Sequence, residues 1–362
     1  MEEKKPQQKT EKESGWRVAG RVLAKLLLVV LETLLLVSGV LYAGMYVLAK
    51  GPSPTLRRLF VTSVRETSAI GFLADLYLTP EEIAEAEAVK ETEEYAPTDT
   101  TLFSESTAVS SDENGAPQPD AWGLVDEDGD GIILVPVKGE GYAGYMMVVL
   151  DPKRVIVGSV PRSFGRRGYT VEQFVAEFDA AAGTNAGGFD DPNGQGNGST
   201  PDSVVVFEGK VYYPQSGCAG GIAAIDADGI LHVAKRMTAK ELEENNIRYA
   251  VCYGPVLISN GVPADPASLP VSLNPRTAIG QRSDKAMLLL VIDGRQASSI
   301  GASYQDEVDI MQRFGAVNAL NLDGGSSSMM WYADGYVNKT ASVIGIRPVP
   351  TSIMVLKEDA EG

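Results

Sequence analysis

Two stretches in the C-terminal half of the chain, residues 286–295 (AMLLLVIDGR) and 319–328 (ALNLDGGSSS), decide the fold. Each is a short apolar run that ends in Asp-Gly, at Asp293 and at Asp323. Such runs predict β-strands, and the Asp-Gly pairs predict the turns that follow them. The two carboxylates are therefore expected at strand ends, where sites in sheet-based domains commonly lie.

The region from Trp122 onward repeats this pattern of short β-like runs and Gly-rich turns. Helices are predicted over 170–182, 238–245 and 304–314, the second with a capping box between Thr238 and Glu241. Because strands dominate without regular βαβ alternation, we expect an α+β fold, a mixed β-sheet catalytic domain with interspersed helices over residues 122–362. The strand candidates are 132–137, 145–150, 155–159, 203–207, 210–213, 221–225, 286–292, 319–322, 328–332 and 351–356.

The N-terminal part has a different character. Residues 26–48 are mostly apolar, carry Glu32 as their one charge, and are long enough to cross a hydrocarbon core of about 30 Å. Residues 1–25 hold seven Lys and Arg against four Glu, so the positive-inside tendency predicts a cytoplasmic basic tail, a single transmembrane helix and an extracellular C-terminal domain at the cell membrane. A cleaved signal peptide is the competing interpretation, but the apolar run is longer than a signal peptide needs.

Residues 49–121 are expected to form a stalk of juxtamembrane helix and acidic linker. Thr79, Pro80 and Glu82 make a helix-start signature, and the acidic helix that follows is expected to be a solvated spacer. Residues 96–121 are rich in Pro, Thr, Ser, Asp and Glu, which is typical of a disordered linker.

Charge and rare residues exclude several classes of function. The net charge is −17, and subtracting the basic tail leaves about −20 for residues 51–362, which disfavours nucleic-acid binding through bulk electrostatics. With His232 as the one histidine, a His-rich metal site is excluded and a Ser-His-Asp triad is disfavoured. Cys218 and Cys252 could form one disulfide or remain two buried thiols.

The run DEDGDG at 126–131 resembles the opening of a calcium loop. An EF-hand needs Glu at the twelfth position, where Val137 stands, so the EF-hand interpretation fails. A turn before the strand at 132–137 is preferred over a cation site of another kind.

Six motifs rich in Gly, Pro and polar side chains resemble, in their order, the phosphodiester glycosidase family, with LDGG and RPVP the most specific. The resemblance covers roughly residues 122–357, and the family includes a lysosomal enzyme that removes N-acetylglucosamine from mannose-phosphate diesters. Ala186 and Ser326 depart from the family pattern, so substrate identity is not transferred. The motifs are GTNAGGF (183–189), GPVLISNG (254–261), PRTAIG (275–280), VIDGR (291–295), NLDGGSSS (321–328) and RPVP (347–350).

Residue chemistry and the motif match together give the candidate site. Asp323 and Asp293 are the candidate catalytic residues, since carboxylates can act as acid, base or nucleophile at a glycosidic centre. Guanidinium groups suit a phosphodiester. No cofactor is expected to be required, although calcium or magnesium could bind near either aspartate. The candidate substrate- and phosphate-binding residues are Asn185, Arg276, Thr277, Arg295, Gly324, Gly325, Ser327 and Arg347.

The expected function is hydrolysis of the glycosidic bond of a sugar-1-phosphodiester in cell-envelope or exopolysaccharide metabolism. One alternative is a non-catalytic surface protein that binds an envelope glycan or teichoic-type polymer. Another is acyl transfer by one of the serines at 326–328, which lacks a histidine partner at a suggestive spacing.

Overall fold

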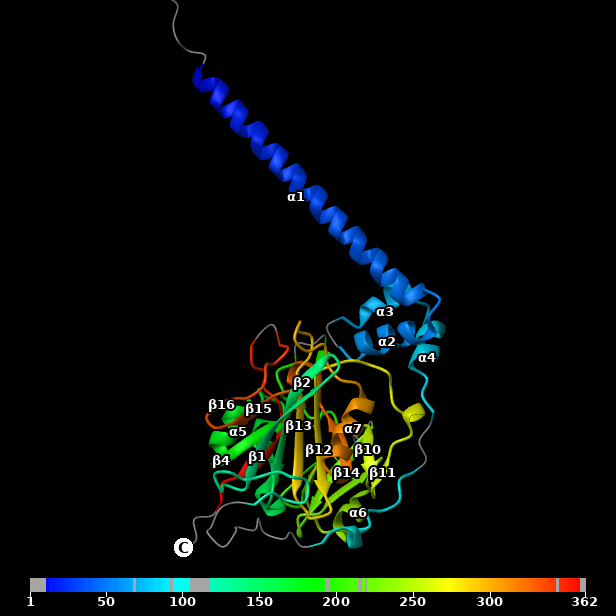
Figure 1. Cartoon of the computed structure of the whole chain (residues 1–362), viewed down its shortest axis with the longest axis vertical. Coiled ribbons are helices and arrows are strands. Elements are labelled where there is room, and N and C mark those ends of the chain that lie inside the picture. Colours follow the sequence, from blue (N-terminus) through cyan, green and yellow to red (C-terminus); the bar gives the residue numbers. More distant parts are fainter. Residues whose placement is uncertain are drawn as a thin grey trace, which may run out of the picture. The chain divides into compact units, whose positions relative to one another are not determined.

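The computed structural model describes residues 11–67, 70–90, 94–104, 118–192, 196–213, 217–218, 220–342 and 345–358. The chain divides into two compact units, Met1–Arg57 and Arg58–Gly362. The first consists mainly of one helix, and the second contains all the described strands (Figure 1).

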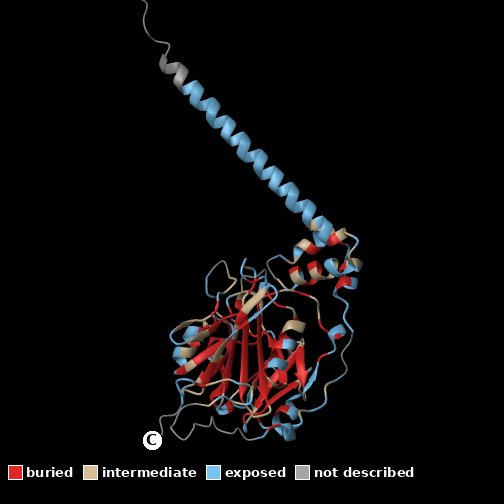
Figure 2. Cartoon of the chain, in the orientation of Figure 1, coloured by how far each residue is buried: buried red, intermediate tan, exposed pale blue. Residues whose placement is uncertain are grey.

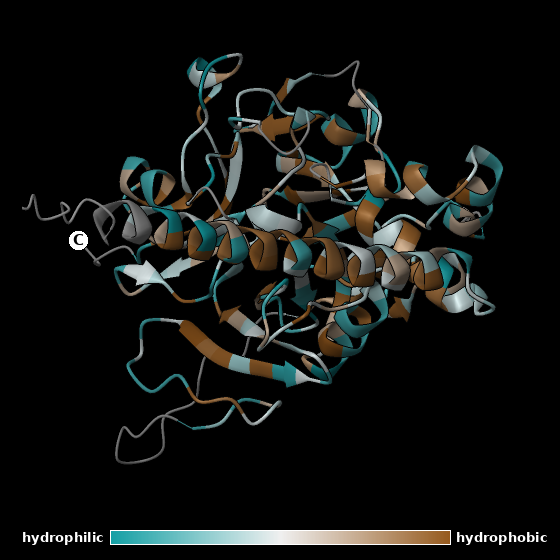
Figure 3. Ribbon diagram, turned by 90° about the horizontal axis from the view of Figure 1, so that it is seen from above, coloured by the Kyte–Doolittle hydropathy of each residue, from teal (hydrophilic) through white to brown (hydrophobic). Residues whose placement is uncertain are grey.

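The helix α1 (Glu11–Lys50) contains the expected membrane segment at 26–48. By length and composition, its stretch from Trp16 to Lys50 could cross a membrane. Its Leu and Val side chains are exposed, in contrast to the buried strands of the second unit (Figure 2). Figure 3 shows hydrophobic residues along most of its length. An exposed apolar surface of this size is stable in contact with lipid rather than with water.

The second unit is built from three antiparallel sheets. The seven-stranded sheet has the order β1-β2-β13-β12-β14-β10-β11, and the two five-stranded sheets have the orders β16-β15-β4-β17-β3 and β6-β5-β9-β7-β8. Every pairing between these strands is antiparallel, so the sheets are not mixed in direction, while the α+β class is confirmed.

The strands have the following bounds. The seven-stranded sheet contains β1 (Ile132–Gly139), β2 (Tyr142–Val149), β10 (Val256–Ser259), β11 (Val262–Pro263), β12 (Arg276–Arg282), β13 (Met287–Ile292) and β14 (Ala316–Leu322). The second sheet contains β3 (Val155–Ser159), β4 (Ala180–Asn185), β15 (Met330–Tyr332), β16 (Gly335–Tyr336) and β17 (Thr351–Leu356). The third contains β5 (Val205–Phe207), β6 (Lys210–Tyr212), β7 (Gly221–Asp226), β8 (Leu231–Ala234) and β9 (Ile247–Tyr253).

The continuous apolar run of β13 follows from burial on both of its faces. Met287, Leu289 and Val291 point into a core that all three sheets share, whereas Leu288 and Leu290 pack in a second core under α7 (Tyr304–Arg313). A strand with one solvated face would alternate apolar and polar residues instead. The run at 286–292 therefore specified a central strand.

The short helices cover the outer faces of the sheets and begin at capping boxes. Thr170, Thr238 and Ser303 cap α5 (Val171–Glu177), α6 (Ala239–Glu244) and α7. Helix α5 is shorter than the helix expected over 170–182, because the chain turns at Asp179 in the left-handed region (φ 49°) and continues as β4. Small Ala and Gly residues let β4 pack in the interior of the second sheet.

The described residues between 58 and 104 pack on the C-terminal domain instead of standing apart as a stalk. The helix α2 (Pro54–Arg65) buries Phe60, Val61 and Val64, and α4 (Pro80–Glu87) begins at the expected Thr79 capping box and buries Ile83. Between them lies α3 (Phe72–Tyr77). Further along, the Asp99 N–H donates to Asn260 Oδ1 (2.8 Å). Half of the linker expected at 96–121 lies outside the described residues, since 105–117 are not described.

Cys218 and Cys252 form a disulfide, so the alternative of two buried thiols is wrong. The bridge links β9 to the segment between β6 and β7. It encloses a loop with a sequence separation of 34 residues.

Candidate active site

Strand pairing brings the candidate residues to one end of the central strands of the seven-stranded sheet. Arg276 pairs with Ile292 at the end of β13, and Thr277 pairs with Leu322 at the end of β14. Asp293 and Asp323 are the next residues after those two strand ends. The start of β12 and the ends of β13 and β14 therefore lie together.

Asn185, the last residue of β4, fixes the backbone at Asp323. It is fully buried, and its Nδ2 donates to the Asp323 carbonyl (2.6 Å). Its Oδ1 accepts from Thr277 Oγ1 (2.9 Å) and from the Met329 N–H (3.2 Å). The Asp323 N–H in turn donates to the Ala186 carbonyl (2.9 Å). Asn185 and Thr277 thus join the first and second sheets at the point where Asp323 begins its turn.

The Asp323 carboxyl is set up for proton transfer near neutral pH. Burial raises its pKa to about 7, against a hydrogen bond from Ser327 and the charge of Arg347, while the carboxylates of Asp202 and Asp191 raise it further. A carboxyl with a pKa near the working pH can both take up and release a proton.

The Gly324-Gly325 turn after Asp323 is packed too closely for larger residues. A Cβ on Gly324 would come within 2.7 Å of the Pro275 carbonyl, and Gly325 has a φ of +60°. The Gly325 N–H donates to the same carbonyl (2.9 Å). The glycines therefore allow the loop before Arg276 to lie directly against the Asp323 turn.

Arg276 and Arg295 differ in what they can bind. Arg276 is only 3% exposed, and its guanidinium stacks on the Tyr304 ring at 3.7 Å from the centroid. Its Nε donates to the Ala302 carbonyl (3.0 Å) and its Nη2 to the Ser272 carbonyl (3.1 Å). Arg295 is exposed, and a Cβ on Gly325 would lie 3.3 Å from its Nη2. Arg295 is therefore the guanidinium of this pair that is available to a ligand.

Arg347 approaches Asp323 from the other side of the turn. It is 4% exposed, donates from Nη1 to Ser326 Oγ (2.8 Å), and donates from Nη2 to Asp191 Oδ1 (2.7 Å). Its Nε is buried and finds no hydrogen-bond partner among the described residues. Part of its donor capacity thus remains for another acceptor.

Asp293 lies at the same end of the central strands, but the hydrogen bonds to its carboxylate serve to hold the chain in place. Its Oδ1 accepts from Asn338 Nδ2 (3.0 Å) and from the Lys339 N–H (2.9 Å). These bonds hold the segment that follows β16. The catalytic role of Asp293 stays a prediction.

Sequence reasoning missed several residues of the site. Tyr253 ends β9 directly before the GPVLISNG motif, and burial first and the Asp323 charge second raise the pKa of its phenol. Glu66 and Thr67 follow α2, in a part of the chain interpreted as stalk. Asp202 approaches Gly188, where an added Cβ would lie 2.6 Å from Asp202 Oδ2. Two motifs could have drawn attention to these residues, GTNAGGF to Asp202 and GPVLISNG to Tyr253, which directly precedes it. No motif lies near Glu66.

A cavity of about 480 Å³ opens beside Asp202. This volume lies within the range of about 300–1,000 Å³ that is usual for ligand sites. The charge of the Asp202 carboxylate also raises the pKa of Asp323. The lining residues are Asp202, Ser203, Gly217, Cys218, Arg236, Met237 and Thr238.

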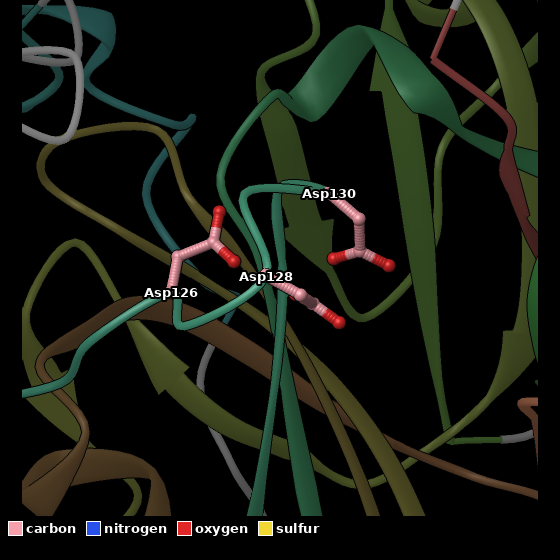
Figure 4. A group of neighbouring side chains, drawn as sticks. All are labelled: Asp126, Asp128 and Asp130. Carbon is pink, nitrogen blue, oxygen red and sulfur yellow. The ribbon is translucent and has the colours of Figure 1, made fainter. Parts of the chain in front are cut away.

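A separate group of carboxylates could hold a cation. Asp126, Asp128 and Asp130 each place one oxygen within 4.8 Å of the others (Figure 4). Asp126 accepts from the Gly129 and Gly131 N–H groups (3.0 Å each), as the preferred turn interpretation predicts. Asp130 Oδ2 accepts from Tyr332 Oη (3.0 Å).

His232 does not support the serine alternative. Its Nε2 lies 2.9 Å from Asp226 Oδ2, within the β7–β8 hairpin. The histidine is therefore engaged in the third sheet and is not paired with the serines at 326–328 in the described contacts.

The site contains a buried carboxyl, Asp323, with the guanidinium groups of Arg295 and Arg347 near it. Residues 178–356 match the family model described as phosphodiester glycosidase. The chain therefore contains a phosphodiester glycosidase domain at 178–356, which confirms the resemblance.

Two individual proteins are similar to the chain. The zebrafish N-acetylglucosamine-1-phosphodiester alpha-N-acetylglucosaminidase catalytic domain, solved in a form auto-inhibited by its pro-peptide, matches with a TM-score of 0.52 and 17% identity. That match covers 75% of this chain and 97% of the zebrafish domain and shows a shared fold. The SPbeta prophage-derived uncharacterized protein YomE of Bacillus subtilis is 29% identical over 166 residues, which is 43% of this chain. The matched region spans 26% of YomE, about a quarter of its length.

Proposed function

We propose that this protein hydrolyses the glycosidic bond of a sugar-1-phosphodiester outside the membrane, in cell-envelope or exopolysaccharide metabolism. The observation that carries the proposal is the Asp323 carboxyl, whose pKa burial raises to about 7 at the end of a central strand. The phosphodiester glycosidase domain supports the reaction class. The basic tail and apolar helix at the N-terminus support a membrane anchor with the domain outside.

In the proposed reaction, Arg295 and Arg347 hold the phosphate and Asp323 acts as general base. Asp323 takes a proton from a water molecule, and the water oxygen forms a bond to the anomeric carbon. The bond from that carbon to the phosphate oxygen breaks, and the phosphate monoester leaves with the bonding electrons. Phosphate is a good leaving group, so the reaction does not need a strong general acid.

The cavity beside Asp202 offers space for the part of the substrate beyond the phosphate. Asp202, Arg236 and Thr238 supply acceptors and donors there, as hydroxyl-rich ligands need. The Nε of Arg347, buried without a partner among the described residues, suits an additional phosphate oxygen.

The test uses the purified full-length chain in detergent with a sugar-1-phosphodiester substrate. We expect released sugar from the wild-type protein and a loss of at least about a thousandfold in kcat for Asp323→Asn, since a general base is removed. Asp293→Asn is the matched variant at the same end of the central strands. A smaller loss of kcat than in Asp323→Asn would assign Asp293 the structural role that its hydrogen bonds indicate.

Near wild-type turnover in Asp323→Asn would remove Asp323 from the mechanism. A wild-type chain that binds envelope glycan but releases no sugar would support the non-catalytic surface protein instead. A divalent cation is tested in the same assay, because loss of activity with a chelator and recovery with calcium or magnesium would show that the reaction needs one.

A further inference from the structure

The segment that follows α2 reaches the arginine pair of the site. We propose that Glu66 is a positioning residue, which holds Arg276 and the loop 272–275 in place and thereby sets the position of Arg295 for a phosphate group. The inference rests on the proposed function in one respect, namely that Arg295 binds the phosphate of the substrate.

Glu66 accepts hydrogen bonds from four different side chains. Its Oε2 accepts from Ser272 Oγ (2.7 Å), Asn274 Nδ2 (2.8 Å) and Arg276 Nη1 (3.3 Å), and its Oε1 accepts from Tyr304 Oη (3.3 Å). With 25% of its side chain exposed, Glu66 lies at the border between this cluster and solvent. A carboxylate with this many donors is held in one geometry.

The backbone around Glu66 is fixed to the same loop. Thr62 Oγ1 donates to the Val271 carbonyl, and Ser63 Oγ accepts from the Leu273 N–H (3.1 Å). Val61 and Val64, on the same helix, are buried. Two hydrogen bonds therefore attach the segment to the backbone just before Arg276.

Glu66 supplies the charge that the buried Arg276 needs. The other carboxyl near Arg276 is Glu307, 3.9 Å from Nε and fully buried. Burial raises the pKa of Glu307 to about 8, so it is mostly protonated and neutral at pH 7. Removing one partner of a buried ion pair leaves an uncompensated charge, which is strongly unfavourable.

Glu66 is connected to the Arg295 guanidinium in two ways, through Asn274 and through its neighbour Thr67. Asn274 donates to Glu66 and accepts on Oδ1 from Arg295 Nη2 (3.0 Å). The same Nη2 also donates to Thr67 Oγ1 (2.7 Å), the residue next to Glu66. Arg295 has a left-handed backbone (φ 56°), a conformation that its surroundings must maintain. The contacts to Asn274 and Thr67 are the ones that direct its guanidinium.

The opposite role would be competition, with Glu66 occupying the place of the phosphate. The contacts favour positioning, because Ser272 and Asn274 are neutral donors that a departing Glu66 would leave unpaired. Each guanidinium nitrogen of Arg276 also already donates to an acceptor of the protein. The two roles predict opposite signs for the effect of neutralising Glu66 on anion affinity.

The test is calorimetric binding of inorganic phosphate to the full-length chain, with the variants Glu66→Gln, Thr67→Ala and Asp75→Asn. We expect phosphate binding about tenfold weaker in Glu66→Gln and about threefold weaker in Thr67→Ala, through loss of the contacts that orient Arg295. Asp75→Asn is the matched control, since Asp75 pairs with Arg65 (3.2 Å) and is 55% exposed. It removes one acidic charge from the same segment without touching the site.

Tighter phosphate binding in Glu66→Gln, or an effect no larger than that of Asp75→Asn, overturns the proposal. A wild-type chain that does not bind phosphate also overturns it. If Glu66→Gln does not fold, the comparison of Thr67→Ala with Asp75→Asn decides the question.

Turnover on a sugar-1-phosphodiester is measured separately. A wild-type chain that binds phosphate but releases no sugar would refute the proposed function and leave this inference standing. In an active enzyme, we expect Glu66→Gln to raise KM more than it lowers kcat, because the residue acts on the binding of phosphate.

Discussion

The raised pKa of Asp323 makes the candidate catalytic residue a source of instability, which Asp323→Asn should relieve. The ordinary pKa of the group is 3.8, and burial raises it to about 7 in the folded chain. Between these values the folded state holds the proton more tightly than the unfolded state. The contribution of Asp323 to the unfolding free energy of the wild type therefore falls as the pH rises from about 4 to about 7.

The size of the effect follows from the same two pKa values. At pH about 5.5 the ionisation of Asp323 costs the folded state about 2 kcal/mol, and at pH about 8 it costs about 4 kcal/mol. Asparagine does not ionise, so its advantage over the wild type should increase by about 2 kcal/mol between these pH values. Comparing two pH values cancels constant contributions, such as the altered hydrogen bond to Ser327.

The assay is urea denaturation of the full-length wild-type and Asp323→Asn proteins in detergent at both pH values, followed by circular dichroism. Asp228→Asn, which changes an exposed aspartate outside the site, is the control. An advantage of Asp323→Asn that stays constant or shrinks as the pH rises would show that the Asp323 carboxyl is not desolvated. Its assignment as a base poised near pH 7 would then be wrong.

Three further predictions concern activity and stability. If Asp323 is the base, kcat/KM should rise with pH up to a pKa of about 7, and a rate that instead falls through this range would indicate an acid role. Arg347→Gln should weaken phosphate binding, which calorimetry measures. It should also lower the unfolding free energy by about 3 kcal/mol, measured by urea denaturation, because the half-buried Asp191 loses its cation. Cys218→Ser should lower the unfolding free energy by about 3–4 kcal/mol through the loss of the bridge to Cys252, and equal stability with and without reductant would contradict this.

Local patterns in the sequence predicted the central strands and helix starts. The apolar runs of β13 and β14 and the capping boxes at Thr79 and Thr238 were identified because they depend on neighbouring residues alone. Strand β4 was partly mistaken for helix, since its Ala-rich sequence has helical propensity and its strand state depends on pairing with β17.

The candidate site was predictable only where chemistry and motif coincided. Asp323 was found because a carboxylate after an apolar strand is a local signal, and the structure shows how Asn185 and Thr277 support it. Glu66 was missed because its partners are more than 200 residues away along the chain. Its neighbours in sequence, Arg65 and Thr67, do not mark it as part of a site.

The arrangement of the sheets bears on how the protein can be divided. The family match begins at residue 178, whereas β1 and β2 cover the open side of β13, and β3 covers that of β17. A fragment of 178–356 would expose long, flat, apolar edges with unsatisfied backbone groups, which invite self-association and aggregation. Segments that precede the recognisable homology are thus required for solubility, and expression trials should retain them.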